Sequence, residues 1–481
     1  MKKIFTAFEF HSDEKFYPAE YCYQGDEQTG WSIYRNGQLF LELGQGYRLL
    51  KSLYCGICST DIARAKLPFA LPQITGHELV ALDHNKPVLV EINASHKARG
   101  VDCKHCPYCV NNMDIHCPER LTLGIDRLPG GFSPYVLAPV NSIIPLPQSL
   151  NPLMASITEP FAAALHAVAS VGIQNHWRVA VVGPRRLGAL LLLALALYRK
   201  QHALEISISA IIRNPELKTF CIQAGADEVI ESSEIDNQRY DLVFDTSGSS
   251  SGFKLALSVC DKILHVKSTH GLPVEGLSKL TEMVIDELSL ESINARSLNS
   301  LQEKIEKQKI NNILIDEAIP GDVIERIQKC CPELQIIRTN IQELKNKSAN
   351  ILLPDNAFKK FDAVCVLSLD LINRVIRNQE NESLLRAGGV IFYYQAQNTE
   401  NPSLLQQVLF DRNVSIQTSR CGSFSQALEL MLANKKLFED FAKKFITHTG
   451  SVEEINSLFD IAKNNKQCIK AVVKHMNKPW D

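Results

Sequence analysis

The chain has 481 residues, a formal net charge of −2 and an apolar content of 45%. Its length suggests roughly two to four domains, and the near-neutral charge gives no reason to expect nucleic acid or a membrane as a partner. The N-terminus soon becomes polar, and the longest apolar run, Leu187 to Leu197, is about half the length that spans a bilayer. We expect a soluble cytoplasmic protein in which this run forms a buried helix.

The first candidate site lies in the stretch YCGICSTDIARAKLPFALPQITGHE, which ends at Glu78. Its C-x-x-C pair, Cys55 and Cys58, could be a redox pair, a structural zinc clamp or part of a catalytic metal site. A catalytic zinc takes three protein ligands and keeps one position open. Cys58 and His77 are candidate ligands, and Glu78 is a candidate acid that supports the ligands.

Four more cysteines cluster in the stretch CKHCPYCVNNMDIHC. Four thiolates on a short loop can enclose one zinc ion and exclude water, which makes a structural site. We predict that its ligands are Cys103, Cys106, Cys109 and Cys117. The alternatives are chance clustering of reduced cysteines and histidine ligands from the same stretch. Because four cysteines complete the shell, we expect His105 and His116 to be exposed loop residues.

The third ligand of a catalytic zinc is expected from a distant loop. The stretch SITEPFAAALHA offers Glu159, a carboxylate directly before a proline and a helical pattern. Taken with Cys58 and His77, it would supply one sulfur, one nitrogen and one oxygen ligand.

These motifs together resemble the zinc-dependent medium-chain alcohol dehydrogenase family, in particular its threonine- and sorbitol-dehydrogenase-like branch. The likeness rests on GICSTD, GHE, the four-cysteine loop, EP before a helix and a VVG…LG turn. It runs from the N-terminus to about residue 290 and resumes from about residue 413 to the end. The resemblance implies an α/β protein with a GroES-like β-rich catalytic domain and a Rossmann domain. It also implies an oxidoreductase that interconverts an alcohol or polyol and its carbonyl compound.

The resemblance also implies roles for single residues. It makes Cys58, His77 and Glu159 the catalytic zinc ligands, and it places Cys55 at a position that is not a ligand. It makes Thr60 the hydroxyl that relays a proton from the alcohol.

The same resemblance makes Asp61 a residue that supports the zinc ligands. The sequence departs from the family at Ala63, where many members continue the relay with a histidine. The proton must therefore leave by another route.

The cofactor half begins with WRVAVVGPRRLGALLLLALALY, an apolar strand, a glycine turn and an apolar helix. This order is typical of the start of a Rossmann unit, where the helix N-terminus receives the pyrophosphate. Gly183 and Gly188 fill the first and third glycine positions, and Leu187 begins the helix. Arg185 occupies the middle position, where its side chain either blocks the dinucleotide or turns away and pairs with its phosphates.

The second strand of this unit ends in Ile212 and Arg213 rather than in an acid that would hold the ribose of NAD. An arginine can accept a 2′-phosphate, so NADP is favoured over NAD. Asp245 and Lys267 end the next two expected strands and are predicted to lie near the nicotinamide, because ligands collect at the carboxyl ends of parallel strands.

A further αβ segment resembles a second copy of the Rossmann unit. The stretches beginning AIIRNPELK and QIIRTNIQELK match, and Asp241 matches Asp362. The second copy lacks the glycine turn, so we interpret it as a degenerate, structural repeat; the alternative is an unrelated αβ insertion. The predicted domains are a catalytic part at 1–165, a Rossmann domain at 166–308, the repeat at 309–434 and a return to the catalytic domain at 435–481.

The sequence thus predicts two zinc ions, one catalytic and one structural, and NADP or NAD as cofactors. The predicted partner is a small alcohol or carbonyl substrate, without nucleic acid or membrane, and the family resemblance implies a homodimer or homotetramer. One alternative is a non-catalytic, zinc-bearing scaffold or sensor descended from a dehydrogenase. Another is a zinc enzyme whose nucleotide is only structural.

Overall fold

The computed structural model describes residues 1–267, 272–293, 298–344, 354, 356–378, 381–395 and 401–475. Contacts divide the chain into two compact units. The first unit comprises residues 1–165, 185–190 and 421–481, and the second comprises residues 166–184 and 191–420. The first unit therefore combines the two ends of the chain with a short segment from its middle.

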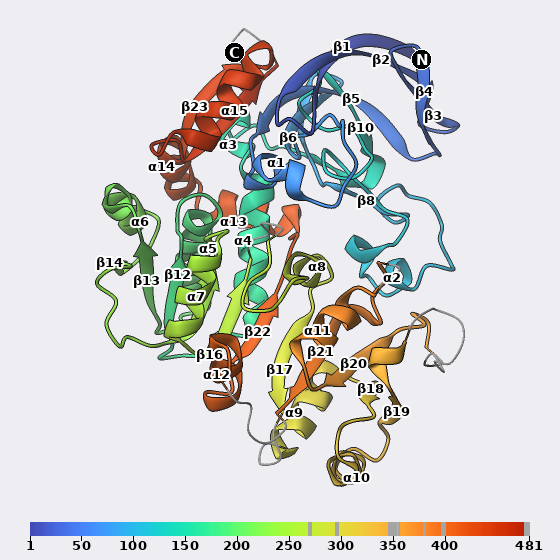
Figure 1. The fold of residues 1–481 in the computed structure, drawn as a ribbon. Coiled ribbons are helices and arrows are strands. Elements are labelled where there is room, and N and C mark those ends of the chain that lie inside the picture. Colours follow the sequence, from blue (N-terminus) through green and yellow to red (C-terminus); the bar gives the residue numbers. More distant parts are fainter. Residues whose placement is uncertain are drawn as a thin grey trace. The chain divides into compact units, whose positions relative to one another are not determined.

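The N-terminal segment of the first unit forms an antiparallel four-stranded sheet in the order β1-β2-β3-β4 (Figure 1). Its strands are β1 (Lys2–Phe10), β2 (Phe16–Asp26), β3 (Gly30–Arg35) and β4 (Gln38–Leu43). Along β2, Ala19, Tyr21 and Tyr23 are buried in the alternating pattern of a half-buried strand. This sheet packs into the same apolar core as the strands that carry the candidate site.

The second sheet of this unit positions the candidate site. Its order is β11-β7-β6-β5-β24-β23, with β10 also paired to β5. The strands are β5 (Tyr47–Gly56), β6 (Glu78–Asp83), β7 (Lys86–Val90), β10 (Tyr135–Pro139), β11 (Ile143–Pro145), β23 (Ile446–Ser451) and β24 (Lys470–Lys474). A two-stranded sheet adds β8 (Asn93–Ala94) and β9 (Leu121–Thr122). Because β24 pairs with β5, the last part of the chain reaches the end of β5.

Helices of the first unit are mostly short. They are α1 (Ser59–Ile62), α2 (Pro107–Val110), α3 (Pro152–Ala155), α4 (Thr158–Val171, which continues into the second unit), α13 (Phe424–Ala433), α14 (Lys435–Phe445) and α15 (Ile455–Asn464). Short 3-10 turns are η1 (Arg64–Lys66), η2 (Asp114–His116), η3 (Val140–Ser142) and η6 (Val452–Glu454). In α14, Phe438, Phe441 and Phe445 are buried at helical spacing, so this helix is held by one apolar face.

The second unit is built on one mostly parallel sheet of eleven strands, in the order β14-β13-β12-β15-β16-β22-β17-β21-β20-β18-β19. The strands are β12 (Arg178–Val182), β13 (Ser207–Ile212), β14 (Glu228–Glu231), β15 (Tyr240–Asp245), β16 (Cys260–Val266), β17 (Ser289–Ile293), β18 (Asn312–Asp316), β19 (Gln335–Thr339), β20 (Phe361–Val366), β21 (Leu385–Tyr394) and β22 (Ser415–Thr418). One apolar core runs along the sheet and contains residues from both αβ segments.

Helices connect these strands, as parallel pairing requires. They are α5 (Leu187–Gln201), α6 (Lys218–Gln223), α7 (Ser250–Val259), α8 (Leu280–Ile285), α9 (Leu298–Gln308), α10 (Gly321–Cys330), α11 (Leu369–Ile376) and α12 (Leu404–Asp411), with the 3-10 turns η4 (Pro215–Leu217) and η5 (Ile341–Glu343). The apolar run that begins α5 is a buried helix, as predicted, with Ala189 to Leu195 at most 1% exposed. Within the described part of the chain, no helix is both long enough and apolar enough to cross a membrane.

The two halves of this sheet follow the same plan. The order β13-β12-β15-β16 on one side matches β19-β18-β20-β21 on the other. The last strand of each half crosses over: β22 pairs with β16, and β17 pairs with β21. These two strands meet in an antiparallel bridge between Leu290 and Ile416 at the centre of the sheet (Figure 1).

The aspartates that matched in the sequence make the same contacts in both halves. In the first half, Asp241 of β15 accepts a hydrogen bond from the backbone N–H of Arg178, at the start of β12, at 2.8 Å. Its other oxygen lies 2.9 Å from the ammonium group of Lys262 in β16. The aspartate thus ties three neighbouring strands together at their amino ends.

In the second half, Asp362 of β20 accepts from the backbone N–H of Asn312, at the start of β18, at 3.3 Å. Its other oxygen lies 2.5 Å from the guanidinium of Arg386 in β21. The two halves thus share a strand order and these contacts, and the degenerate repeat with its origin by duplication stays a prediction.

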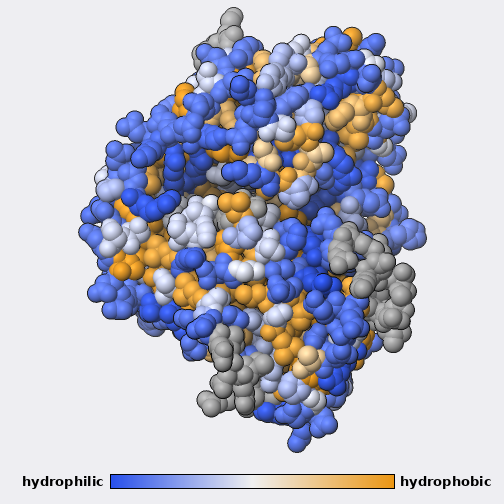
Figure 2. Space-filling model, in the orientation of Figure 1, coloured by the Kyte–Doolittle hydropathy of each residue, from blue (hydrophilic) through white to orange (hydrophobic). Residues whose placement is uncertain are grey.

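The face drawn in Figure 2 shows polar side chains with apolar patches among them. Large exposed apolar side chains on the N-terminal sheet include Ile4 (56% exposed), Leu39 (55%) and Phe40 (38%). Scattered exposed apolar residues are ordinary on folded proteins, so they support no functional conclusion.

Acid is expected to destabilise the second unit through His265 in β16. The ring is fully buried and lies 2.9 Å from the Ser419 hydroxyl. Burial and the charge of Lys267 lower the pKa of His265 to about 3. An unfolded histidine gains its proton near pH 6.5, so between about pH 6.5 and 3 only the unfolded chain binds this proton. The free energy of unfolding should then fall by about 1.4 kcal/mol per pH unit from this group as the pH decreases.

Urea unfolding at several pH values checks this expectation. His265→Gln, which keeps a donor for Ser419, should flatten the pH dependence relative to the unsubstituted protein. His202→Gln, at an exposed position, should leave the pH dependence unchanged. Equal slopes for the unsubstituted and His265→Gln proteins would contradict the assignment.

Candidate active site

The first group of candidate ligands lies where β5 ends and β6 begins. The two strands pair antiparallel with Gly56 opposite Glu78, so Cys58, just after β5, and His77, just before β6, are brought together. One ligand atom from each of Cys58, His77 and Glu78 lies within 4.8 Å of the others. His77 and Glu78 are buried, at 2% and 0% exposed, and Cys58 is partly exposed. The site therefore has two buried donors and one more accessible sulfur.

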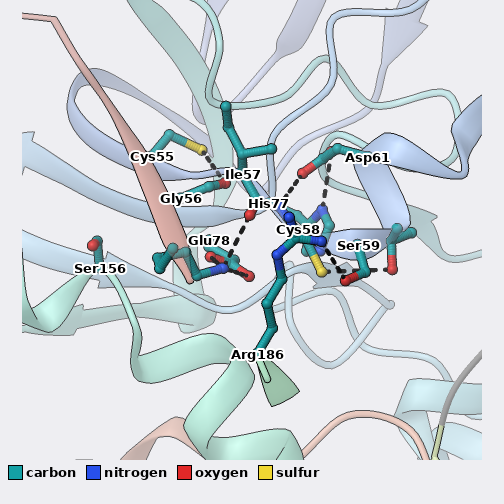
Figure 3. A network of polar contacts seen from close by, with 12 residues as sticks. Cys55, Gly56, Ile57, Cys58, Ser59, Asp61, His77, Glu78, Ser156 and Arg186 are labelled. Atoms are coloured by element: carbon teal, nitrogen blue, oxygen red, sulfur yellow. Dashed lines mark hydrogen bonds and ion pairs between the residues drawn. The ribbon is translucent and has the colours of Figure 1, made fainter. Parts of the chain in front are cut away.

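Asp61 joins the two loops that carry these residues (Figure 3). Its Oδ2 accepts the backbone N–H of Cys58 at 2.8 Å, and its Oδ1 accepts the backbone N–H of Gly76 at 3.2 Å. Asp61 Oδ1 also lies 3.6 Å from Nδ1 of His77. The predicted supporting role of Asp61 thus has a geometric basis: it fixes both ligand loops from a buried position.

A glycine is required beside Glu78. A Cβ on Gly56 would lie 2.0 Å from Oε2 of Glu78, so any other residue at that position would displace the carboxylate. The glycine of the GICSTD motif therefore makes room for the acid at the site.

Lys470 of β24 is a component of the site that the sequence did not indicate. Its ammonium group lies 2.6 Å from Oε1 and 2.5 Å from Oε2 of Glu78, and it also donates to the carbonyl of Ile57 at 3.1 Å. Lys470 and Glu78 are 2% and 0% exposed. A carboxylate has about four acceptor positions, so Glu78 can contact Lys470 and still offer a lone pair to a metal ion.

The donor set fits a zinc ion. Sulfur, imidazole nitrogen and carboxylate oxygen are the ligands that zinc prefers, and three protein ligands leave a position open. Nδ1 of His77 is buried without a hydrogen-bond partner. Burial lowers the pKa of His77, but the negative charges of Asp61 and Cys58 outweigh this and raise it well above its usual value. The surroundings therefore favour positive charge at this point.

Only two of the three predicted catalytic ligands are in this group. Cys58 and His77 lie together, whereas Glu159, in the first turn of α4, is not in the group, and Glu78 takes the third place. Thr60 Oγ1 lies 3.7 Å from Cys58 Sγ, next to this group. Cys55 is buried, with its sulfur 3.9 Å from the carbonyl of Gly56, and is outside the group.

The second group of candidate ligands also differs from the prediction. Cys106, Cys109 and Cys117 come together with His96, and Cys103 is not part of this group. Cys103 Sγ instead accepts the backbone N–H of Cys106 at 3.2 Å. Sequence reasoning missed His96 because it lies outside the cysteine spacing.

The expectation for the other two histidines of this loop is half right. His105 is exposed, as expected, whereas His116 is buried, at 7% exposed. His116 lies near the ring of Tyr108, with ring centroids 6.3 Å apart.

The glycine turn after β12 has the backbone geometry that is expected at its first glycine. Gly183 has φ +77°, and a Cβ on it would lie 2.7 Å from Cα of Ser247, so only glycine fits. Arg185, in place of the middle glycine, turns away from this turn. Its guanidinium donates to the carbonyls of Asn465 and Cys468 at 2.6 and 2.7 Å.

Its neighbour Arg186 bonds to the same C-terminal segment. It donates to the carbonyl of Ile469 at 3.2 Å and also to that of Ala462, and it reaches the Ser59 hydroxyl at 3.4 Å (Figure 3). Burial lowers the pKa of Arg186, and the positive charge of Arg185 adds to this.

The remaining predicted cofactor residues have different surroundings. Leu187 and Gly188 begin α5, and Arg213 is exposed after β13. Asp245 is 2% exposed and accepts the backbone N–H of Ser247 at 2.9 Å; burial raises its pKa to about 6. Lys267 is 6% exposed and donates to the hydroxyl of Ser419 at 3.1 Å. Arg213 is therefore the most accessible of these groups.

The first unit also contains a cavity of about 1040 Å³. Tyr54, Lys86, Glu439 and Lys474 contribute to its lining, whereas the candidate ligands do not. The cavity is therefore separate from the metal group, and we assign it no role.

Comparisons with known proteins agree with this geometry. Residues 44–148 match the family described as alcohol dehydrogenase GroES-like domain. The chain is 33% identical over 152 residues to L-galactonate-5-dehydrogenase of Escherichia coli, covering 30% of this chain and 44% of the relative. It is 28% identical over 197 residues to sorbitol dehydrogenase of Halalkalibacterium halodurans, covering 39% and 55%. The chain thus spans about half the length of these curated relatives.

Solved structures share the fold across nearly the whole chain. L-idonate 5-dehydrogenase of Escherichia coli superposes with a TM-score of 0.54 at 12% identity, covering 99% of each chain. A structure of CAD from Helicobacter pylori complexed with NADP(H) gives a TM-score of 0.53 at 13% identity, covering 100% of each chain. At these identities the likeness concerns the fold alone.

The matched domain and the shared fold define a protein with a GroES-like part and a Rossmann-like part. The chain is similar to sorbitol and L-threonine 3-dehydrogenases, and its residues 44–148 match the alcohol dehydrogenase GroES-like domain.

Proposed function

We propose that the protein is a zinc-dependent oxidoreductase that interconverts an alcohol or polyol and its carbonyl compound by hydride transfer with a nicotinamide cofactor. The observation that carries this proposal is the convergence of Cys58, His77 and Glu78 within 4.8 Å in a GroES-like domain. Three ligands of this kind leave a coordination position for an oxygen of the substrate. The similar proteins L-galactonate-5-dehydrogenase and sorbitol dehydrogenase support the same class of reaction by their names.

Each residue of the site has a proposed role. Cys58, His77 and Glu78 would hold zinc, which when bound polarises the carbonyl oxygen or lowers the pKa of the alcohol. Asp61 keeps both ligand loops in place through its bonds to the backbone of Cys58 and Gly76. This assignment replaces Glu159 with Glu78 as the third ligand.

Proton transfer is assigned to Thr60. Its hydroxyl lies 3.7 Å from Cys58 Sγ, and the residue is partly exposed. A partly exposed hydroxyl can pass a proton directly to water, so a histidine at position 63 is not needed for the proton to leave. The proposed cofactor is NADP, with Gly183, Leu187 and Gly188 forming the turn and helix start that receive the pyrophosphate.

Titrations with NADPH and with NADH, followed by nicotinamide fluorescence, test the cofactor assignment. NADPH is expected to bind more tightly than NADH, because the exposed guanidinium of Arg213 can pair with the 2′-phosphate. Hydrogen bonds to charged groups contribute about 1.5–3 kcal/mol, so Arg213→Ala should weaken NADPH binding by about 10- to 100-fold. Binding of NADH should not change.

Lys218→Ala is a matched control, because it removes an exposed positive charge from the same region. It should leave both affinities unchanged. If neither nucleotide binds the unsubstituted protein, the scaffold interpretation becomes the better one. If a nucleotide binds but is not oxidised or reduced with any alcohol or carbonyl compound tested, its role is structural.

The wider assignments stay predictions. We propose a small alcohol or carbonyl compound as the substrate, a cytoplasmic location, and a homodimer or homotetramer. Size-exclusion chromatography with light scattering measures the number of chains in the assembly.

A further inference from the structure

Arg186 brings a positive charge to the candidate metal group. It lies in the turn before α5, and residues 185–190 belong to the first unit together with this group. Its Nη1 donates to the hydroxyl of Ser59 at 3.4 Å, and Ser59 directly follows Cys58 in the chain (Figure 3). The guanidinium therefore contacts the residue next to a proposed zinc ligand.

The other partners of this guanidinium are neutral. Its Nε donates to the carbonyl of Ile469 at 3.2 Å, and its Nη2 donates to the carbonyl of Ala462. Among the described residues, no carboxylate forms an ion pair with Arg186. A charge that is largely removed from water is costly unless an opposite charge compensates it. Arg186 is therefore a partly buried cation without a matching anion in the described part of the chain.

The negative groups of the site that influence Arg186 have other partners. Burial lowers the pKa of Arg186, and the charges of Cys58 and Glu78 act in the opposite direction. Glu78 is paired with Lys470 at 2.6 Å, and Cys58 is a proposed zinc ligand. Neither group is free to form an ion pair with Arg186, whereas an anion from outside the chain can do so.

The guanidinium has donors left for such an anion. Arginine carries five N–H groups in a planar fork that matches the oxygens of a carboxylate or a phosphate. Three of the five serve the bonds to Ser59, Ala462 and Ile469, which leaves two. Arg186 is partly exposed and Ser59 is exposed, so a small ligand can reach both the guanidinium and the hydroxyl.

We propose that Arg186 binds an anionic group of the substrate, so that the protein acts on a polyol that carries a carboxylate or a phosphate in preference to a neutral polyol. This inference rests on the proposed function, because it places the anion beside the group that would hold the reacting hydroxyl. Carboxylate and phosphate share the chemistry that the fork recognises, which is a pair of oxygens that accept two parallel N–H bonds. The anion fixes the position of the substrate and takes no part in hydride transfer.

Calorimetric titration of the zinc-loaded, full-length protein tests the anion site without requiring turnover. The probes are D-gluconate, D-glucitol 6-phosphate and D-glucitol, which have carbon chains of equal length and differ in charge. At least one anion is expected to bind more tightly than D-glucitol, and the tighter of the two identifies a carboxylate or a phosphate as the preferred group. Absence of any preference for the anions would overturn the proposal.

Arg186→Gln should weaken binding of the tighter anion by about 10- to 100-fold, because it removes a charged hydrogen-bond donor, and should leave the affinity for D-glucitol unchanged. Arg186→Lys keeps the charge without the planar fork and should lose less affinity. Lys466→Gln is the matched control, because it removes an exposed positive charge from the C-terminal segment that Arg186 contacts. It should leave all three affinities unchanged.

Two other binding results would contradict the assignment. An anion that coordinates the metal directly would keep its affinity in Arg186→Gln. A loss of affinity for NADPH and NADH in Arg186→Gln, with the anions unaffected, would place the guanidinium on the cofactor instead of the substrate.

Initial rates separate this inference from the proposed function. Arg186→Gln should raise KM for the preferred anionic polyol by the same about 10- to 100-fold and leave kcat nearly unchanged, as expected when binding is lost equally in the ground and transition states. If neutral and anionic polyols are oxidised with equal kcat/KM, the proposed function stands and the inference is wrong. If the anions bind through Arg186 and no polyol is oxidised, the anion site stands and the proposed function is wrong.

Discussion

Lys470→Met is expected to lower the free energy of unfolding of the metal-free protein by about 3–5 kcal/mol. The substitution leaves the carboxylate of Glu78 buried without the ammonium group that lies 2.5–2.6 Å from both of its oxygens. An unpaired buried charge costs far more than the pair itself contributes. Urea unfolding in the presence of a chelator measures the difference.

Two comparisons sharpen this expectation. The double variant Lys470→Met/Glu78→Gln removes both charges and should recover part of the loss. Zinc should also recover part of the loss in Lys470→Met, since the proposed ligand role gives Glu78 a new cation. Equal free energies of unfolding for Lys470→Met and the unsubstituted protein, both without metal, would show that the buried pair does not stabilise the fold.

Cys58→Ala is expected to remove one zinc ion per chain and to lower the rate of alcohol oxidation by at least about 10³-fold. The metal is expected to stabilise the transition state by several kcal/mol, and each 1.36 kcal/mol corresponds to a factor of ten in rate. Metal analysis and initial rates with a panel of polyols measure the two effects.

Cys55→Ala is the matched control, because Cys55 belongs to the same C-x-x-C and is outside the ligand group. It should keep both zinc ions and most of the activity. If Cys55→Ala loses metal to the same extent as Cys58→Ala, the two cysteines act as a clamp and the proposed site is wrong.

Local sequence patterns account for part of the candidate site. Cys58 and His77 were found because C-x-x-C and GHE are local motifs at the ends of two strands that pair. The choice between Glu78 and Glu159 depends on where a distant helix lies, which no local pattern records. Lys470 is 392 residues from Glu78 along the chain, so its contact appears only when β24 pairs with β5.

The cysteine loop shows the same limit at short range. The regular spacing of Cys103, Cys106 and Cys109 predicts a metal site in this loop. Spacing gives the types of donor that are near one another but not the direction of each side chain. His96 enters the group because Glu119 holds its ring, and that contact was not predictable from residue types.

The turn at Gly183 is a feature that the local sequence can predict. Its positive φ and its close approach to Ser247 both require a glycine, and a glycine is present between the apolar strand and the apolar helix. The direction of Arg185 was left open, and the structure places its guanidinium on the carbonyls of Asn465 and Cys468. Those acceptors come from the C-terminal part of the chain, so the local sequence around Arg185 could not predict this contact.

The crossing of β17 and β22 determines which strands can accept a new neighbour. Both strands are paired on their two sides, so among the strands that the structure describes β14 and β19 are the outer ones of this sheet. An open strand edge is where another chain can add by hydrogen bonding. A second copy could therefore lengthen this sheet only at β14 or β19, and expressing either αβ half alone would uncover β16 or β21 as a new, aggregation-prone edge.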